Sequence, residues 1–186
     1  MNFLESFSSY LAAVDVEDDM NAPASSETIQ QVEAALSEQD RIRGFKMPPS
    51  YRSFLLKWDG GSANWDGGET EEDDSNAAYV QFFSVAPDEA HGCDVMRINK
   101  ADSVLMNHEI ETYFPFEPLV LFASDEGSNF WAFDPRETRK DGEMPVRFCD
   151  HETGDIYAQA EDFPSFILAL SNRELKYRSL DEPLNE

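Results

Sequence analysis

The feature that most constrains the fold of this 186-residue chain is a pair of short apolar runs separated by a polar turn. The runs cover residues 119–123 and 130–133, and the turn covers residues 125–129. Apolar runs of this length, bounded by Gly, Asp and Asn, are typical of adjacent buried strands in a hairpin. Neither run alternates cleanly between apolar and polar residues. We therefore expect both faces of the hairpin to be covered, or helices to pack on one face and loops on the other.

Four other segments repeat apolar residues three and four positions apart, as an amphipathic helix requires. They are residues 2–14, 27–37, 48–58 and 162–170. For the second helix, a capping box at Thr28 and a cap at Ser26 are equally compatible with the sequence. The third helix opens on prolines and ends before Gly60, and Asp162 is the expected cap of the last. We favour packing of the first helix on the domain over a role in partner binding or dimerisation.

Further strands are predicted at residues 79–85, 145–149 and about 156–157, where aromatic and β-branched residues gather. Residues 94–112 are ambiguous, with weak helical spacing. The predicted organisation is an N-terminal helix and linker (1–26), one domain (27–170) and a charged tail (171–186). A hydrophobic content of 41% with 14 Phe is enough to form a core, which argues against a globally disordered chain.

The charge balance is strongly acidic, with 38 Asp and Glu against 14 Lys and Arg and a net charge of −24. A phosphate backbone or an anionic membrane surface would be repelled, so we expect no nucleic-acid or membrane partner. No apolar run is long enough to span a membrane, and the N-terminus lacks the basic residues of a secretory signal, so a cytoplasmic location is expected. The charge favours a cationic protein partner. The alternative is that acidity only confers solubility or reflects a salt-adapted host.

One short acidic stretch is the candidate partner-binding site. Like charges this close repel one another and favour an exposed loop. The candidate residues are Trp65, Asp66, Glu69, Glu71, Glu72, Asp73 and Asp74. An exposed aromatic residue surrounded by charge is a plausible interface anchor, although Trp65 could equally fold back on the domain.

Catalytic and metal chemistry have only weak signals. His91 and Cys93 mirror Cys149 and His151, and if both pairs lay on neighbouring strands they could form a zinc site. Cys149 and His151 could also be read as nucleophile and base, but nothing in the sequence supports that geometry. The acidic stretch does not match a calcium-binding loop, and no phosphate-binding glycine loop is present. We predict no catalytic residue, no metal and no cofactor.

An ordered series of short motifs resembles a known family. The series consists of Ile29 with Glu33, then Met47-Pro48-Pro49-Ser50-Tyr51-Arg52-Ser53-Phe54-Leu55, Asp59-Gly60-Gly61, Phe122-Ala123-Ser124-Asp125-Glu126-Gly127 and Phe163-Pro164-Ser165-Phe166-Ile167. It is similar to the SUKH superfamily, in the branch named for the yeast cell-wall assembly regulators, over roughly residues 27–170. The chain departs from that pattern at Met47, where the family has leucine, at Asp59, where it has asparagine, and at residues 126–128, where it has more glycine.

The resemblance implies an α+β domain with a mostly antiparallel sheet flanked by helices, here with an extra N-terminal helix. Bacterial members of the family act as immunity proteins that neutralise polymorphic toxins, often nucleases, and fungal members are regulatory scaffolds. The resemblance implies no common catalytic residues. We therefore expect a non-enzymatic binding protein whose partner is a cationic toxin domain. The alternative is a regulatory or scaffold domain that binds a housekeeping protein.

Overall fold

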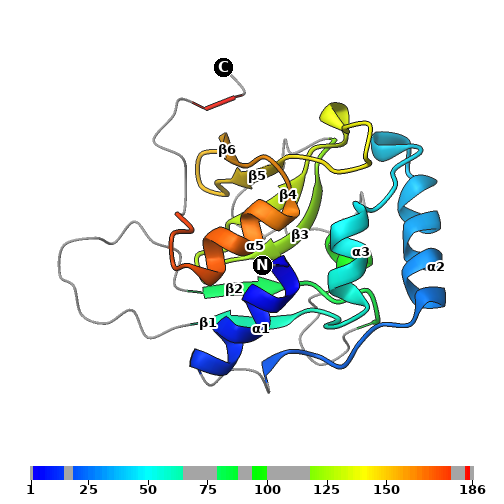
Figure 1. Ribbon diagram of the computed structural model, residues 1–186. Helices are drawn as coiled ribbons and strands as arrows, with labels where there is room; N and C mark the ends of the chain where they lie inside the picture. Colours follow the sequence, from blue (N-terminus) through cyan, green and yellow to red (C-terminus); the bar gives the residue numbers. More distant parts are fainter. Residues whose placement is uncertain are drawn as a thin grey trace.

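The structure, a computed structural model, describes residues 2–14, 19–64, 79–87, 94–99, 118–176 and 183–184. The helices within these ranges are α1 (Phe3–Val14), α2 (Ser26–Ser37), η2 (Asp40–Ile42), α3 (Pro49–Leu55), α4 (Val95–Ile98), η3 (Pro135–Glu137) and α5 (Phe163–Ser171), where η marks a 3-10 helix (Figure 1). The strands are β1 (Gly61–Asn64), β2 (Tyr79–Phe82), β3 (Val120–Ser124), β4 (Phe130–Phe133), β5 (Val146–Cys149) and β6 (Ile156–Ala160).

The six strands form one antiparallel sheet in which each strand pairs with its neighbour in the sequence. The predicted hairpin is its centre: β3 pairs with β4, and the Asp125 N–H donates to the Asn129 carbonyl at 3.1 Å to close the turn. All of β4 is buried, as is β3 up to Ala123. The structure thus confirms the α+β class and the mostly antiparallel sheet expected from the sequence.

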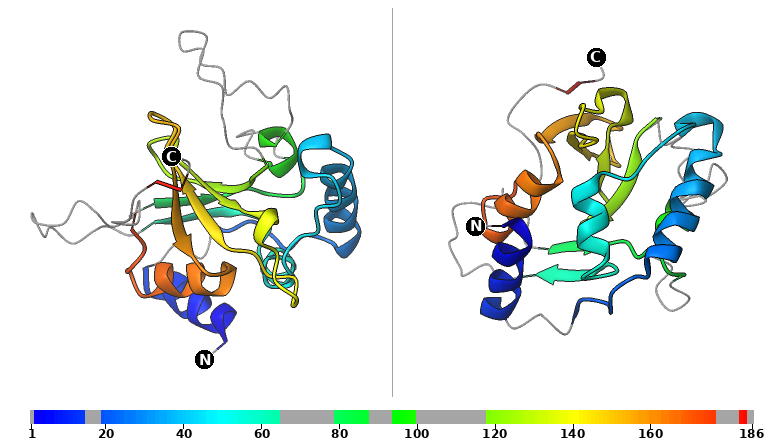
Figure 2. Two further views of the ribbon diagram at one scale, coloured as in Figure 1. Left: turned by 90° about the horizontal axis from the view of Figure 1, so that it is seen from above. Right: turned by 45° about the vertical axis from the view of Figure 1, so that its right-hand side comes forward.

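Helices α1, α3 and α5 cover one face of the sheet, and α2 lies beside α3 at its end (Figures 1 and 2). Aromatic rings fill the space between these layers because the apolar faces of α3 and α5 both point at the central strands. Tyr51 on α3 lies 5.1 Å from both Phe133 and Phe163, measured between ring centroids. Phe166 on α5 contacts Trp131 at 5.6 Å. This aromatic layer is the core of the domain.

Helix α1 packs against α5 as part of this layer, which confirms the favoured reading of the first helix. Its Phe7 is fully buried and contacts Trp58 and Phe82. The chain then reaches the outer edge of β1, where Met20 forms a bridge with Gly61. Gly61 has φ of +112°, and a Cβ atom there would lie 2.4 Å from the Asp19 carbonyl oxygen, so this close approach requires glycine.

Buried carboxylates connect the elements by accepting hydrogen bonds from backbone amides. Glu33 on α2 accepts from the Met47 N–H at 2.8 Å and pairs with Arg52 on α3. Asp59, just after α3, accepts from the amides of residues 85 and 86 at 2.6 and 3.0 Å. Burial raises the pKa of Asp59, against the lowering effect of these two hydrogen bonds. Glu143 accepts from the Ser50 N–H and hydroxyl, and so caps α3 from a distant loop.

Several local expectations need correction. Strand β1 was not predicted, because Gly61–Asn64 has no apolar alternation and is a strand only through its pairing with β2. The cap of α2 is Ser25, whose hydroxyl accepts from the Thr28 N–H, instead of Ser26 or Thr28. Within residues 94–112 the structure describes residues 94–99, which contain α4, and residues 100–112 lie outside the described residues. The cap at Asp162 is confirmed. Within the described ranges, none of the helices has the length and apolar character needed to cross a membrane.

Candidate functional site

The predicted partner-binding residues, Trp65 to Asp74, lie outside the described residues, but the points where their connection leaves and rejoins the sheet are defined. Asn64 at the end of β1 pairs with Tyr79 at the start of β2. In an antiparallel sheet ordered as in the sequence, the connections β1–β2, β3–β4 and β5–β6 all lie at the same end. The topology therefore fixes the end of the sheet at which the candidate residues are attached.

The two described connections at this end are joined to each other. The backbone N–H of His151, in the β5–β6 turn, donates to the side-chain oxygen of Asn129 in the β3–β4 turn at 3.1 Å. The His151 Nδ1 atom lies 3.0 Å from the same oxygen. The other end of the Asn129 amide donates to the buried Asp125 carboxylate at 2.8 Å. The two turns thus form one surface, held by a chain of three polar side chains.

Four carboxylates on these two turns form what we call the acidic rim: Glu126, Asp150, Glu152 and Asp155. Glu126 and Glu152 are exposed, whereas Asp150 accepts hydrogen bonds from the backbone amides of its own turn. Among the salt bridges that link described residues, none involves a rim carboxylate. Within the described ranges, no basic side chain therefore offsets the charge of the rim.

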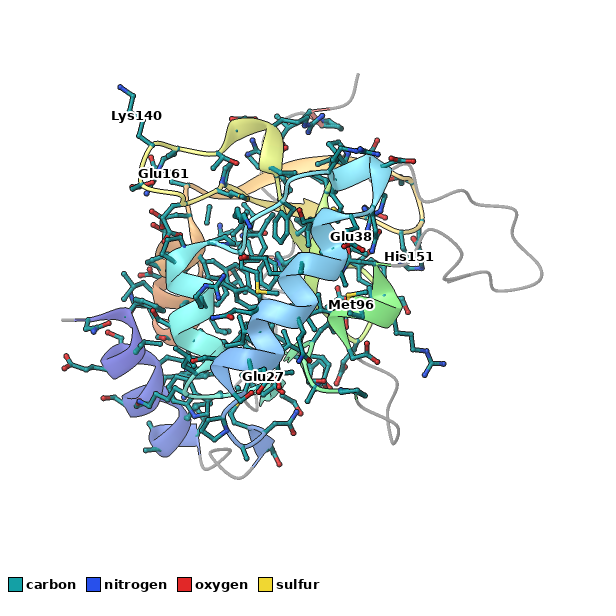
Figure 3. The ribbon with its side chains drawn as sticks, turned by 90° about the vertical axis from the view of Figure 1, so that its right-hand side faces the viewer. Glu27, Glu38, Met96, Lys140, His151 and Glu161 are labelled. Carbon is teal, nitrogen blue, oxygen red and sulfur yellow. The ribbon has the colours of Figure 1, made fainter. Side chains whose placement is uncertain are left out.

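At the opposite end of the sheet, around the β4–β5 connection, basic side chains form salt bridges with carboxylates. Asp134 is fully buried and binds Arg136 at 2.7 Å and Arg147 at 3.4 Å. Burial alone would raise the pKa of Asp134, but hydrogen bonds and charge from Arg136, with the charge of Arg147, outweigh burial and lower it. Figure 3 shows Lys140 of this connection and His151 of the β5–β6 turn on opposite sides of the molecule. Arg136 and Arg147 are thus held in ion pairs with Asp134 at the end of the sheet opposite the rim.

The described structure does not bring the candidate cysteine and histidine residues together. His91 and Cys93 lie outside the described residues. Cys149 is fully buried in β5, and burial raises the pKa of its thiol, so the thiolate needed for nucleophilic or metal chemistry is disfavoured. The described residues contain no group of three or more side chains able to hold a metal ion. His151 has its Nδ1 atom directed at Asn129.

Sequence reasoning found the acidic connection but missed the neighbouring rim. Its carboxylates are spread over two turns that are separated by about twenty residues in the sequence, so no local run of charge reveals them. The signal that could have found them is topological. If the predicted strands at 145–149 and about 156–157 are paired as a second hairpin beside the one at 119–133, both turns lie at one end of an antiparallel sheet.

Comparison with known proteins gives a family for this fold. The model of the SMI1 / KNR4 family (SUKH-1) matches residues 23–169, which include α2 to α4, all six strands and α5 except its last two residues. No curated protein matches the chain. Domains of this family generally bind protein partners such as toxins, serve as immunity or regulatory modules, and are generally non-enzymatic. The match covers well over half of the chain, so the chain belongs to the SMI1 / KNR4 (SUKH-1) family.

Proposed function

We propose that this chain is a non-enzymatic immunity-type protein that neutralises a basic toxin domain in the cytoplasm by covering its active surface. The observation that carries the proposal is the charge arrangement. The connection holding the candidate residues is attached at the end of the sheet that carries the acidic rim, and no rim carboxylate is in a salt bridge with a described base. A nuclease toxin must present positive charge to phosphate, which gives this surface a complementary target.

The first experiment identifies the partner and its activity. Tagged protein is used to capture partners from the source organism at low and at high salt, and the recovered protein is then expressed with and without this chain. Recovery of one cationic protein, lost at high salt, whose toxicity is abolished by co-expression supports the proposal. Recovery of a non-toxic housekeeping protein supports the regulatory or scaffold alternative and contradicts neutralisation.

Electrostatic steering makes a second, kinetic prediction for that partner. The Debye length falls from about 10 Å at 0.1 M salt to about 3 Å at 1 M. We expect the association rate to fall steeply over this range while the dissociation rate changes less. An association rate that is independent of salt contradicts the role of charge in the encounter.

Matched charge variants test the location of the interface. The double variant Glu126→Gln/Glu152→Gln removes two exposed rim charges, and Glu5→Gln/Glu27→Gln removes two exposed charges from α1 and α2. Both variants have the same net charge. We expect slower association only for the rim variant, because a local field steers a partner to the surface that produces it. If both variants slow association equally, the effect comes from the net charge alone and not from the position of the rim.

Trp65 is proposed as the interface anchor of the neighbouring connection. Trp65→Ala should raise the Kd by about thirtyfold or more, as expected for a buried aromatic hot spot worth about 2 kcal/mol. Replacing the six acids of that connection by their amides should mainly slow association. Unchanged affinity in both variants would remove Trp65 to Asp74 from the interface.

A further inference from the structure

The chain covers the two edges of the sheet in different ways. The edge of β1 is covered by the segment before α2, through the Met20–Gly61 bridge and a hydrogen bond from the Asn21 N–H to the Gly60 carbonyl at 3.1 Å. The opposite edge is formed by β6. A sheet edge offers backbone donors and acceptors to any extended segment that can align with it.

Alternation along β6 shows which residues present these groups. The Asp150 N–H donates to the Asp155 carbonyl at 2.9 Å, so residue 155 faces β5. Backbone groups alternate along a strand, which places residue 157 toward β5 and residues 156 and 158 toward the outer edge. The Ile156 carbonyl confirms this direction, because it accepts a hydrogen bond from the Leu184 N–H at 2.7 Å. The C-terminal segment of the chain therefore already forms a hydrogen bond, through Leu184, with the outer edge of β6.

That segment is poorly suited to hold the edge. Between described residues, Leu184 donates a single hydrogen bond to the edge, and its side chain is 53% exposed, so it buries little apolar surface. Residues 181–186 carry Asp181, Glu182 and Glu186. β6 itself lies between acidic residues, with Glu152 and Asp155 before it and Glu161 after it. Like charges repel, so an acidic segment binds here less well than a basic one would.

We propose that the outer edge of β6 is a binding surface for an extended, basic segment of a partner protein, which pairs with Ile156 and Ala158 as an added strand and displaces the chain's own Leu184. Main-chain hydrogen bonds would provide affinity, and the acidic residues at both ends of β6 would select for positive charge. The inference rests on the proposed function only in taking the partner to be cationic. It is tested with a synthetic strand, so either idea can fail without the other.

The probe is a fluorescein-labelled peptide of alternating Lys and Val, eight residues long, and the readout is fluorescence anisotropy. A matched peptide with N-methyl groups on every residue has the same charge but has no amide N–H to donate from either of its edges. We expect the first peptide to bind and the methylated one to bind at least about fivefold more weakly, the cost of roughly one hydrogen bond. Equal binding of the two peptides would mean that charge alone attracts them, and would overturn the proposal.

Chain variants locate the binding to β6. A chain ending at Leu180 lacks the competing segment, and should bind the peptide more tightly than the full chain. Ala158→Pro removes an outward N–H and should weaken binding about fivefold, whereas Ala158→Ser keeps the N–H and should bind normally. Thermal unfolding checks that Ala158→Pro is folded; where it is not, the two peptides and the shortened chain decide the outcome.

Two results would overturn the assignment of a partner strand. Dimerisation of the chain ending at Leu180, without tighter peptide binding, would identify a second copy as the occupant of the edge. Peptide binding that is unchanged by both the shortened chain and Ala158→Pro would place the contact elsewhere on the acidic surface. Neither result would affect the capture experiment for the toxin partner.

Discussion

At the scale of single residues, one buried hydroxyl has an unusual environment. Tyr51 is 2% exposed, and its hydroxyl has no hydrogen-bond partner in the described structure. Burial raises the pKa of this phenol, so it stays neutral at every ordinary pH. A buried polar atom without a partner lowers stability, because it has lost water and gained nothing in return.

Tyr51→Phe is therefore expected to stabilise the protein by about 1 kcal/mol, since it removes the buried hydroxyl and keeps the ring. The matched control is Tyr157→Phe, whose hydroxyl donates to Asp155 at 3.3 Å and whose removal should not stabilise. Urea unfolding of both variants measures the difference. A loss of stability in Tyr51→Phe would show that the hydroxyl has a partner, such as a bound water molecule.

The lowered pKa of Asp134 predicts a specific pH dependence of the free energy of unfolding. Its pKa in the folded state is lowered from 3.8, so its contribution is fully present above pH 4 and is lost as the pH falls through the folded value. Asp134→Asn should cost about 3 kcal/mol at pH 7, because Arg136 and the nearly buried Arg147 both lose this buried carboxylate, and Arg147 keeps only the exposed Glu137 as a charge partner. The difference between wild type and variant should shrink below pH 4, as measured by urea unfolding.

The matched control for that experiment is Asp141→Asn, which removes an exposed partner of Arg139. It should change the free energy of unfolding little, because an exposed pair is screened by water. A difference between wild type and Asp134→Asn that stays constant down to pH 2.5 would contradict the charge-based account of Asp134.

At the scale of elements, α1 decides whether the N-terminal segment is an appendage or part of the domain. The family match begins at residue 23, yet Phe7 is fully buried between Phe54, Trp58 and Phe82. Phe7→Ala should cost about 3–5 kcal/mol, as for other buried phenylalanines. Ser9→Ala, at an exposed position of the same helix, should have almost no effect. Equal, small effects in thermal unfolding would make α1 a detachable appendage.

The elements also show what the sequence could predict. The β3–β4 hairpin and α1, α2, α3 and α5 have local signals, namely apolar spacing, caps and turn residues, and these were found. Strand β1 has none, because its identity depends on β2. The guanidinium of Arg41 donates to the carbonyls of Asn99 and Leu119, which are 58 and 78 residues away. Backbone carbonyls carry no residue signature, so such a connection is invisible in one sequence.

The candidate site was predictable to the same extent. The run from Asp66 to Asp74 stands out in composition, whereas the rim of Glu126, Asp150, Glu152 and Asp155 exists only because antiparallel order brings two turns together. Charge in a continuous run is a property of the sequence. Charge assembled from separate turns is a property of the topology.

At the scale of the whole molecule, the net charge of −24 acts on stability and on association in opposite ways. Six described Lys and Arg residues form salt bridges with carboxylates, which leaves most acids to repel one another. Screening weakens this repulsion as well as the attraction of a cationic partner. The thermal midpoint should therefore rise with NaCl between 0.05 and 0.5 M, over the same range in which association slows.

The rim variant separates the two effects. Glu126→Gln/Glu152→Gln and Glu5→Gln/Glu27→Gln reduce the net charge equally, so both should flatten the salt dependence of the thermal midpoint slightly. The second variant also loses two carboxylates from the first turns of α1 and α2, so its midpoint should rise less than that of the rim variant. Only the rim variant should slow association. A protein whose acidity serves solubility alone would show the stability effect in both variants and a partner rate that neither variant changes. Measuring midpoint and association rate on the same four-protein set, with the Trp65→Ala variant included, distinguishes charge that steers from charge that only keeps the chain in solution.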